Sequence, residues 1–383
     1  MKAKNLLSPV LIIALLAFIA IGSTLLIKNK RNQLHQIRYQ EANALLRDSK
    51  YAEALTILKA IYPKIKGETQ TEILYQIGIC YQKTGEITEA KKYWDKVLNS
   101  KYSFHHPEIY YEFAQQRLRE ANFEEAQFYY SQITEKFPSH SLAGNATLGP
   151  VDIYIAKREF EKARQYCEEI IENLDYSSKI REITIDKLGE ININLLFSPL
   201  VTDISEIYSV KAGDSLFSIS RKFNTTIALL VRANNLPNSV IKPGQKLKIT
   251  INKFSILVHV DKQDLFLHYD DKSFKRYKIA VGAKETPTPL GTFEIREKIK
   301  DPTWYPAGGG VVPPHSAQNL LGSRWMGLWE TGKKTGYGLH EAIEPSDIST
   351  YISNGCIRMV KSDLEEIYDI VTIGTGVIIQ SKE

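Results

Sequence analysis

The stretch Tyr208–Ile249, YSVKAGDSLFSISRKFNTTIALLVRANNLPNSVIKPGQKLKI, decides the fold of the middle of the chain. Alternating apolar residues at its beginning and its end predict two strands, because successive side chains of a strand point to opposite faces. Between them Asp214 or Ser215 can cap one helix, a second helix follows, and Pro243 and Gly244 break the chain before the last strand. The order strand, helix, helix, strand predicts a small domain of its own.

Three turns of this stretch carry a resemblance to a known family. The sequence GDSL at 213–216, the N-x-L of Asn234–Leu236 and IKPGQKLKI at 241–249 resemble the LysM module, to which we assign residues 208–250. The resemblance implies binding to glycans that contain N-acetylglucosamine, through two loops. The implied residues are Gly213, Asp214, Ser215 and Leu216 in the first loop, and Leu236, Pro237, Asn238 and Ile241 in the second.

Upstream, residues 33–200 are polar with helical spacing of apolar residues, and a short signature recurs. It reads YAEA at 51–54, ITEA at 87–90, FEEA at 123–126 and FEKA at 160–163, and its last alanines are 36, 36 and 37 residues apart. A small residue at this period resembles the tetratricopeptide repeat, in which helix pairs stack into an all-α solenoid. Two interpretations stay open: a helical spacer, or a concave surface that binds a protein partner.

The chain begins with a membrane-anchor candidate. Residues Pro9–Ile27 are uncharged and long enough to cross a hydrocarbon core of ~30 Å as a helix. The alternative is a cleaved signal peptide, but the apolar run is longer than a typical signal core and no clear A-x-A site follows. We therefore expect a membrane anchor within residues 1–32, although the flanking charges do not decide its orientation.

Composition excludes several classes of function. The net charge of +5 is small for 383 residues and is not gathered into basic blocks, so nucleic acid is not an expected partner. Cys80, Cys167 and Cys356 are the three cysteines; they are far apart in sequence, without a CxxC pair. Neither a disulfide framework nor a zinc site is expected, and no metal or other cofactor is predicted.

From residue 254 onward the pattern is that of strands, and ISNGCIRM at 352–359 carries the candidate chemistry. A cysteine becomes a nucleophile when a histidine favours its thiolate, and His340 precedes Cys356 by sixteen residues. Gly355 allows a close approach of main-chain N–H groups, and Arg358 would lie on the same side of a strand as Cys356. Spacing alone does not exclude the alternative of a buried, inert cysteine.

A resemblance to a known family favours a nucleophilic Cys356 over an inert, buried one. The motif S-x-G-C-I-R-M after a histidine, with TPTPLGTFEI at 286–295 and LGSRWMGL at 321–328, resembles the L,D-transpeptidase (YkuD-like) catalytic domain, which we assign to residues 254–383. The resemblance implies a mainly-β fold with Cys356 as the nucleophile and His340 as the general base. It places the oxyanion and the substrate near Gly355, Arg358, Ser353 and Asn354.

Two departures from the family pattern are visible. Many members have glycine or serine where this chain has Glu341, and histidine where it has Asn354. In the family the third catalytic member is the main-chain carbonyl just after the histidine, which any residue can supply. His315 is an alternative base, but its Pro-flanked, Gly-rich surroundings are typical of a mobile loop. The whole segment 301–338, which contains Trp304, Trp325 and Trp329, is predicted to be a lid, and the alternative is that at least one of these tryptophans closes the core of the small barrel.

The resemblances together predict a multidomain membrane protein: an N-terminal transmembrane helix, an all-α repeat region, a βααβ LysM module and a mainly-β catalytic domain. They imply transfer of a peptidoglycan stem peptide to an amine acceptor on the outer side of the bacterial cytoplasmic membrane, with loss of D-alanine. Two alternatives remain, a cell-wall cysteine carboxypeptidase and a non-catalytic tether that binds peptidoglycan.

Overall fold

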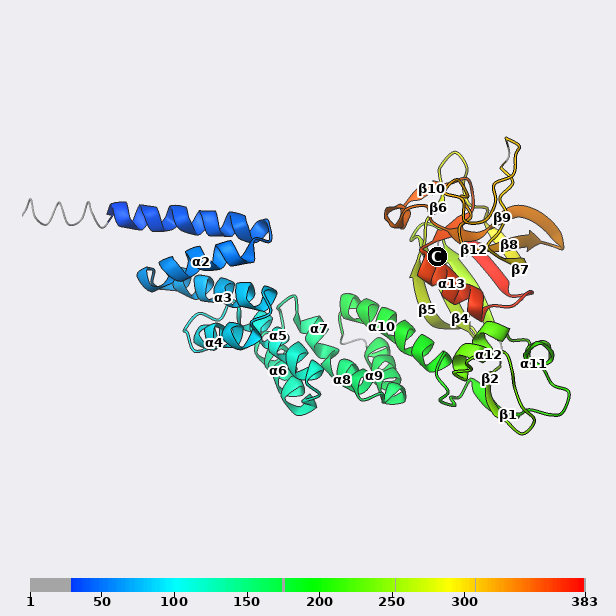
Figure 1. Cartoon of the computed structure of the whole chain (residues 1–383), viewed down its shortest axis with the longest axis horizontal. Helices are drawn as coiled ribbons and strands as arrows, with labels where there is room; N and C mark the ends of the chain where they lie inside the picture. Colours follow the sequence, from blue (N-terminus) through cyan, green and yellow to red (C-terminus); the bar gives the residue numbers. More distant parts are fainter. Residues whose placement is uncertain (1–28, 174–175, 252, 307, 382–383) are drawn as a thin grey trace, which may run out of the picture. The chain divides into compact units, whose positions relative to one another are not determined.

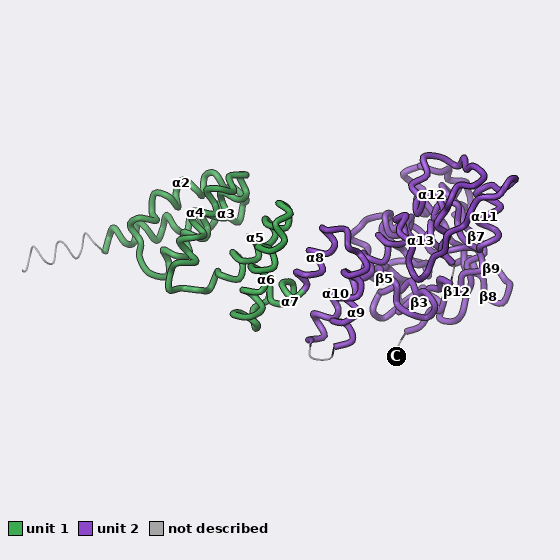
Figure 2. The backbone as a smooth tube through the Cα atoms, turned by 90° about the horizontal axis from the view of Figure 1, so that it is seen from below, with its two compact units in different colours: residues 1–147 green, residues 148–383 purple. Residues whose placement is uncertain are grey.

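The computed structural model describes residues 29–173, 176–251, 253–306 and 308–381. The chain divides into two compact units, residues 1–147 and 148–383 (Figure 2). The predicted membrane anchor, Pro9–Ile27, lies outside the described residues. Within the described ranges, no helix is both long enough and apolar enough to span a membrane.

The first unit is a series of helices packed in pairs (Figure 1). Residues 29–47 are helical, and Ala42 lies in the same buried cluster as Ala54 and Leu58 of the next helix. The others are α2 (Tyr51–Ile61), the short η1 (Tyr62–Lys64), α3 (Glu68–Lys83), α4 (Ile87–Leu98), α5 (His106–Arg119), α6 (Phe123–Lys136) and α7 (Ala143–Thr147).

Each predicted repeat signature opens a helix, as the repeat pattern requires. The signatures begin α2, α4, α6 and, in the second unit, α9 (Phe160–Glu172), and their alanines are 0% exposed. A small side chain there lets two helices approach closely. The α3–α4 pair uses a glycine in the same way: a Cβ on Gly78 would lie 2.1 Å from Nε1 of Trp94. The prediction of helical repeats is confirmed.

In the second unit, α10 (Ser178–Leu196) follows α8 (Gly149–Ala156) and α9 and docks on the catalytic sheet. Asn192 donates to the carbonyl of Phe274 over 2.9 Å. The Arg276 guanidinium forms two hydrogen bonds with the carboxylate of Asp186, at 2.8 and 2.7 Å. A two-bond arginine–carboxylate contact fixes orientation as well as distance, so the last helix of the repeat region is held to the sheet.

The segment between α10 and the catalytic sheet has the predicted βααβ order. It consists of β1 (Ser205–Ser209), α11 (Leu216–Lys222), α12 (Ile227–Ala233) and β2 (Lys246–Thr250), with β1 and β2 antiparallel. Ser215 caps α11 in a reciprocal pair with Ser218, as expected for one of the two candidate caps. Leu216, Ile219 and Leu230 lie in a small core of its own.

The C-terminal part is built on an eight-stranded sheet, in the order β11-β9-β8-β7-β12-β3-β4-β5, and on a two-stranded pair, β10-β6. The strands are β3 (Phe254–His259), β4 (Asp264–Tyr269), β5 (Lys272–Lys278), β6 (Val281–Gly282), β7 (Gly291–Lys300), β8 (Arg324–Glu330), β9 (Lys333–Glu341), β10 (Tyr351–Ser353), β11 (Ile357–Met359) and β12 (Gly376–Gln380). The short η2 (Pro345–Asp347) precedes β10, and α13 (Lys361–Ile370) packs on β8 and β9. The predicted mainly-β architecture is confirmed.

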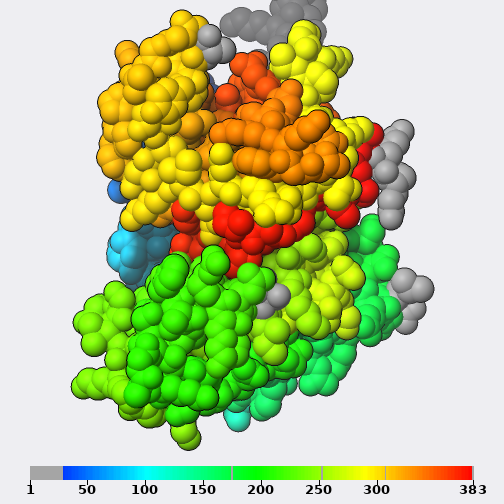
Figure 3. Space-filling model, turned by 90° about the vertical axis from the view of Figure 1, so that its right-hand side faces the viewer, coloured from blue at the N-terminus to red at the C-terminus, as the bar shows by residue number. Residues whose placement is uncertain are grey.

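The LysM segment also shares the main core of the catalytic part. Leu229 and Ala233 of α12 belong to the same buried cluster as the sheet residues and α13. Beside them, the Thr226 hydroxyl donates to the carbonyl of Asp369, and Arg232 forms an ion pair with the Asp369 carboxylate at 2.9 Å. In Figure 3 the green segment lies against the red C-terminal residues. The two parts therefore form one packed body.

A buried lysine completes this junction. Lys248 of β2 is 2% exposed, and its ammonium donates to the carbonyls of Leu195 at 2.7 Å and Ser198 at 2.9 Å, near the C-terminal end of α10. The last carbonyls of a helix have no partner within the helix, and a positive charge there is favourable. Lys248 therefore ties the LysM segment to α10.

One local prediction was wrong. The predicted lid, residues 301–338, is shorter, because Trp325 and Trp329 lie on β8 and the irregular part covers only 301–323. The strand pairing of β8 with β7 and β9 outweighs the loop-like Gly and Trp composition of that stretch.

We predict that Leu229→Ala destabilises the catalytic sheet as well as the LysM segment. Removing a fully buried leucine costs about 2–4 kcal/mol of unfolding free energy, and Leu229 is 2% exposed within the shared core. Hydrogen exchange of the β3 and β12 amides measures this loss. Phe217→Ala is the matched control, since Phe217 is 64% exposed on α11. Unchanged protection in Leu229→Ala would mean that the two parts are energetically independent.

Candidate active site

The parallel pairing of β11 with β9 brings the two candidate catalytic residues together. Arg358 lies opposite His340, and Ile357 lies opposite Leu339. Cys356 stands one residue before Ile357, which places it beside Gly338, and the Gly338 N–H forms a hydrogen bond to its thiol. Because side chains alternate along a strand, Cys356, Arg358 and His340 lie on one face of the sheet.

His340 is held in a fixed orientation. Its side chain is 4% exposed, and Nδ1 lies 2.9 Å from the carbonyl oxygen of Glu341. A carbonyl can only accept, so this contact puts the ring proton on Nδ1 and leaves Nε2 to accept another. The ring of Trp325, opposite on β8, lies 6.1 Å away between centroids. The carbonyl after the histidine, which the resemblance implies as a third catalytic group, belongs here to Glu341.

The electrostatics favour a neutral cysteine–histidine pair in the resting enzyme. The pKa of His340 is lowered to about 4, first by burial and then by the Arg358 charge, while the carbonyls of Glu341 and Leu320 act in the opposite direction. Burial also raises the pKa of the Cys356 thiol, and the Gly338 N–H and Arg358 offset part of that rise. Both shifts favour the uncharged thiol and imidazole over a thiolate–imidazolium pair.

Ser353 and Gly355 build the turn that carries Cys356. Ser353 is 0% exposed; its hydroxyl accepts the Gly355 N–H at 3.2 Å and donates to the Cys356 carbonyl. Gly355 has φ +99°, and a Cβ there would lie 2.5 Å from the Tyr337 ring. Both were assigned to the oxyanion and substrate region. In the structure both residues lie in the turn just before Cys356, and their hydrogen bonds set its position. The Gly355 N–H already donates to the Ser353 hydroxyl.

Asn354 and Arg358, the other two assigned residues, have different environments. Asn354 is exposed, and its side-chain oxygen lies 3.5 Å from the hydroxyl of Thr286. The same hydroxyl donates to the Ser353 carbonyl at 3.0 Å. Thr286 lies in the motif TPTPLGTFEI, but no role was predicted for it from the sequence. Its place in that motif was the signal that could have pointed to its contact with Asn354 and Ser353.

Arg358 forms a long ion pair with Asp347. Its side chain is 12% exposed, its Nη1 lies 3.9 Å from the carboxylate of Asp347, and its Nε makes no hydrogen bond within the described part of the chain. A guanidinium that is largely buried and only loosely paired keeps donors free for a carboxylate. Arg358 is placed to receive an anionic group of a substrate.

The assigned LysM residues fall into two groups. The first loop is mainly structural: Asp214 accepts the Lys211 N–H and the Tyr208 hydroxyl, each at 2.8 Å, Ser215 caps α11, and Leu216 is 3% exposed. Gly213 is exposed with φ +88°.

In the second loop Pro237 and Asn238 are exposed, and Leu236 and Ile241 are half-buried. Sequence reasoning missed two apolar side chains next to these loops, Phe217 and Val240, which are 64% and 71% exposed. Both are large apolar residues within polar stretches of sequence, and this pattern could have identified them as candidates for a binding surface.

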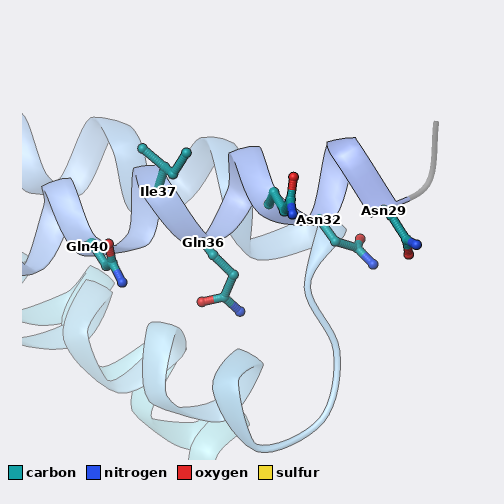
Figure 4. A pocket seen from close by; sticks show the side chains of 6 residues that line it. Asn29, Asn32, Gln36, Ile37 and Gln40 are labelled. Atoms are coloured by element: carbon teal, nitrogen blue, oxygen red, sulfur yellow. The ribbon is translucent and has the colours of Figure 1, made fainter. Parts of the chain in front are cut away.

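Two pockets differ in their chemistry. One of about 540 Å³ lies along the helix of residues 29–47 and is lined by amides and one isoleucine (Figure 4). Its residues are Asn29, Asn32, Gln33, Gln36, Ile37 and Gln40. None of them is a nucleophile or a general base, so this pocket cannot perform the predicted chemistry.

The other pocket, of about 170 Å³, lies at the end of β9, at Glu341, the residue after His340. It is lined by His315, Ser316, Asn319, Gly322, Ser323 and Glu341. His315, the alternative base, is exposed in the 301–323 loop and lies in this pocket rather than in the β9–β11 register that brings Cys356 and His340 together. Among the described residues, no group of histidine, cysteine and carboxylate side chains could hold a metal ion.

Comparison with known proteins finds three family models along the chain. Residues 253–379 match the model of the L,D-transpeptidase catalytic domain (YkuD), residues 208–250 match the LysM domain, and residues 72–101 match the tetratricopeptide repeat. The catalytic domain of an Enterococcus faecium L,D-transpeptidase, solved by NMR, aligns over 33% of this chain and 96% of that chain at 25% identity, with a TM-score of 0.27, which carries no argument by itself.

Two full-length relatives are more informative. YkuD of Bacillus subtilis, provisionally named an L,D-transpeptidase, is 34% identical over 45% of this chain and 97% of its own length. Its counterpart in Bacillus licheniformis is 35% identical over 45% of this chain and 98% of its own length. Since almost the whole of these proteins is represented here, the chain belongs to the YkuD family of L,D-transpeptidases.

Proposed function

We propose that this protein is a cell-wall transferase in which Cys356 is acylated by a peptidoglycan stem peptide and passes the acyl group to an amine. The observation that carries the proposal is the parallel register of β9 and β11, which puts a thiol and a buried imidazole on one face of the sheet. Membership of the family supplies the substrate class. A non-catalytic tether would not need this arrangement.

In the first half-reaction the Cys356 sulfur attacks the carbonyl carbon of the third residue of the stem. The thiol proton passes to Nε2 of His340, and the bond to the terminal D-alanine breaks as that proton is given to the departing amine. The imidazolium formed is stabilised by the Glu341 carbonyl at Nδ1, 2.9 Å away. The product is a thioester on Cys356 and free D-alanine.

In the second half-reaction the acceptor amine attacks the thioester carbonyl. His340 takes a proton from the attacking amine and returns it to the sulfur, so the thiol is regenerated and a new amide bond is formed. A stem-peptide side chain, a lipoprotein lysine or a free D-amino acid supplies the amine. Water in the same position would make the enzyme a carboxypeptidase, and exclusion of water by the 301–323 loop favours transfer.

The remaining parts bring this chemistry to its substrate. We assign the membrane anchor to residues 1–32, the repeats to 33–200, the LysM module to 208–250 and the catalytic domain to 254–383. Because peptidoglycan lies outside the cytoplasmic membrane, residues beyond 32 belong on the outer side. The exposed side chains of Phe217, Pro237, Asn238 and Val240 are the LysM surface best suited to sugar rings, and the repeats offer a surface for a protein partner.

We predict that the full chain, incubated with stem tetrapeptides and an amine acceptor, gains the mass of the donor minus D-alanine, and then releases a cross-linked product. Mass spectrometry of enzyme and products measures both steps. Cys356→Ser should form no thioester. Release of free tripeptide without cross-linking would identify a carboxypeptidase, and unchanged substrate would favour the tether.

We predict that iodoacetamide labels Cys356 before the other two cysteines at neutral pH. Cys80 and Cys167 are each 0% exposed, and burial raises their pKa values to about 11 and about 12, whereas Cys356 is partly exposed. Peptide mapping at timed intervals gives the three rates. His340→Ala should slow labelling of Cys356 alone. Equal rates at all three sites would identify Cys356 as an ordinary packing residue.

We predict that acylation persists into mildly acidic solution and is half-maximal near pH 4. The neutral imidazole is the active form, and because the pKa of His340 is lowered to about 4, that form predominates above this pH and is lost as the pH falls through it. Initial rates of thioester formation between pH 3.5 and 8 measure the limb, with circular dichroism to exclude unfolding. A midpoint near 6.5, the ordinary value for histidine, would contradict a buried neutral base.

A further inference from the structure

The 301–323 loop rejoins the sheet at β8, and its last residues contact Glu341, which follows His340 on β9. The Ser323 N–H donates to Oε2 of Glu341 at 2.8 Å, and the Glu341 N–H donates to the carbonyl of Leu321 at 3.3 Å. One residue thus makes both a side-chain and a main-chain contact with the end of the loop. A backbone N–H held by a carboxylate is a strong, charge-assisted hydrogen bond.

Gly322 is shaped to fit against this side chain. It has φ +68°, in the left-handed region, and a Cβ added to it would lie 2.3 Å from Cβ of Glu341. Any larger residue would push the loop and the glutamate apart. The close approach of Gly322 therefore belongs to the same contact as the Ser323 hydrogen bond.

The segment held in this way forms part of the surroundings of His340. The Leu320 carbonyl acts on the ring from the loop, and the Glu341 carbonyl accepts from Nδ1. The other groups that face His340 are Arg358 and Cys356 from the β11 side, and the uncharged Trp325 from β8. From the loop, His315 lines the adjoining pocket together with Glu341.

We infer that the Glu341 side chain is a positioning residue for acyl transfer: by holding the Ser323 N–H, it keeps residues 320–323 against His340 and keeps water away from the ring. The inference rests on the proposed function of Cys356 and His340. It adds a role for a side chain at a position where the family's third catalytic contribution is made by the main chain alone.

The neighbouring pocket explains why the contact between Glu341 and Ser323 matters for His340. A space of about 170 Å³ lined by polar groups is large enough to admit water. If the carboxylate no longer holds Ser323, the loop end can move into this space and solvent can reach the imidazole. Hydration favours the charged form of histidine, so release of the loop should raise the pH at which His340 titrates.

The test compares Glu341→Ala with Glu341→Gln in the full chain. The glutamine oxygen can still accept the Ser323 N–H, so Glu341→Gln should behave as the parent protein, whereas Glu341→Ala should titrate about two pH units higher, near the ordinary value for histidine. At pH 5 a rise of the midpoint from about 4 to about 6 reduces the neutral fraction, and with it the rate of thioester formation from a stem tetrapeptide, about tenfold. At pH 8 the two rates should agree within about twofold, by the same arithmetic.

Two further variants and a second readout keep the outcome decisive. Gly322→Ala should reproduce the shift with the carboxylate intact, and it serves if Glu341→Ala does not fold. The exposed Glu330→Ala, at the end of β8, is the matched control. NMR titration of the ¹³C-labelled histidines, with His340 assigned through His340→Ala, reports the midpoint without catalysis.

The outcomes separate the two proposals. If the parent protein forms no thioester, the proposed function fails, while the NMR midpoint still decides the role of Glu341. A folded Glu341→Ala with an unmoved midpoint would overturn the positioning role. An equal shift in Glu341→Gln would overturn the part assigned to the Ser323 hydrogen bond.

Discussion

The parallel hydrogen-bonded register between β9 and β11 is the constraint on which the site depends. It sets Arg358 opposite His340, and the turn before β11 then leaves the Cys356 sulfur beside the Gly338 N–H. β11 has only three residues. Its other edge is held by two reciprocal main-chain hydrogen bonds between Arg358 and Ala280, each at 2.9 Å. A slip by one residue would turn both Cys356 and Arg358 to the opposite face.

Burial of this register has a chemical consequence. Water is excluded from the imidazole, so neither the thiolate nor the imidazolium is stabilised in the resting state, and both pKa shifts favour the uncharged pair. In the proposed reaction, charge develops only when the carbonyl of a substrate is attacked, at low dielectric and close to Arg358. Such a pair is less open to adventitious oxidation than a standing thiolate, since thiolate character governs that reaction.

The sequence allowed the architecture to be predicted, but not the surroundings of the candidate nucleophile and base. Periodicity located the repeat helices, because Ala54, Ala90, Ala126 and Ala163 mark close packing at a regular interval. The motif around Cys356 pointed to the candidate pair of Cys356 and His340, whose catalytic roles stay a prediction. The structural roles of Ser353 and Gly355 were not predictable, because a turn hydroxyl that bonds its own main chain looks in sequence like a substrate ligand. The lid was predicted too long, because pairing across β8 is a long-range interaction.

The sequence likewise did not reveal that the LysM segment packs into the core of the C-terminal sheet. The apolar residues of α12 would follow the same pattern whether the helix covered its own two strands or a neighbouring domain. Here Leu230 faces the module's own core and Leu229 faces the shared one. A domain joined by a flexible linker would let bound glycan and thioester move independently, with only a raised local concentration. A domain that shares a core, and that Lys248 also fixes to α10, holds its sugar-facing loops in one orientation to the β9–β11 site. In the proposed function, the geometry of the wall, rather than affinity alone, then determines which stem peptides Cys356 can reach.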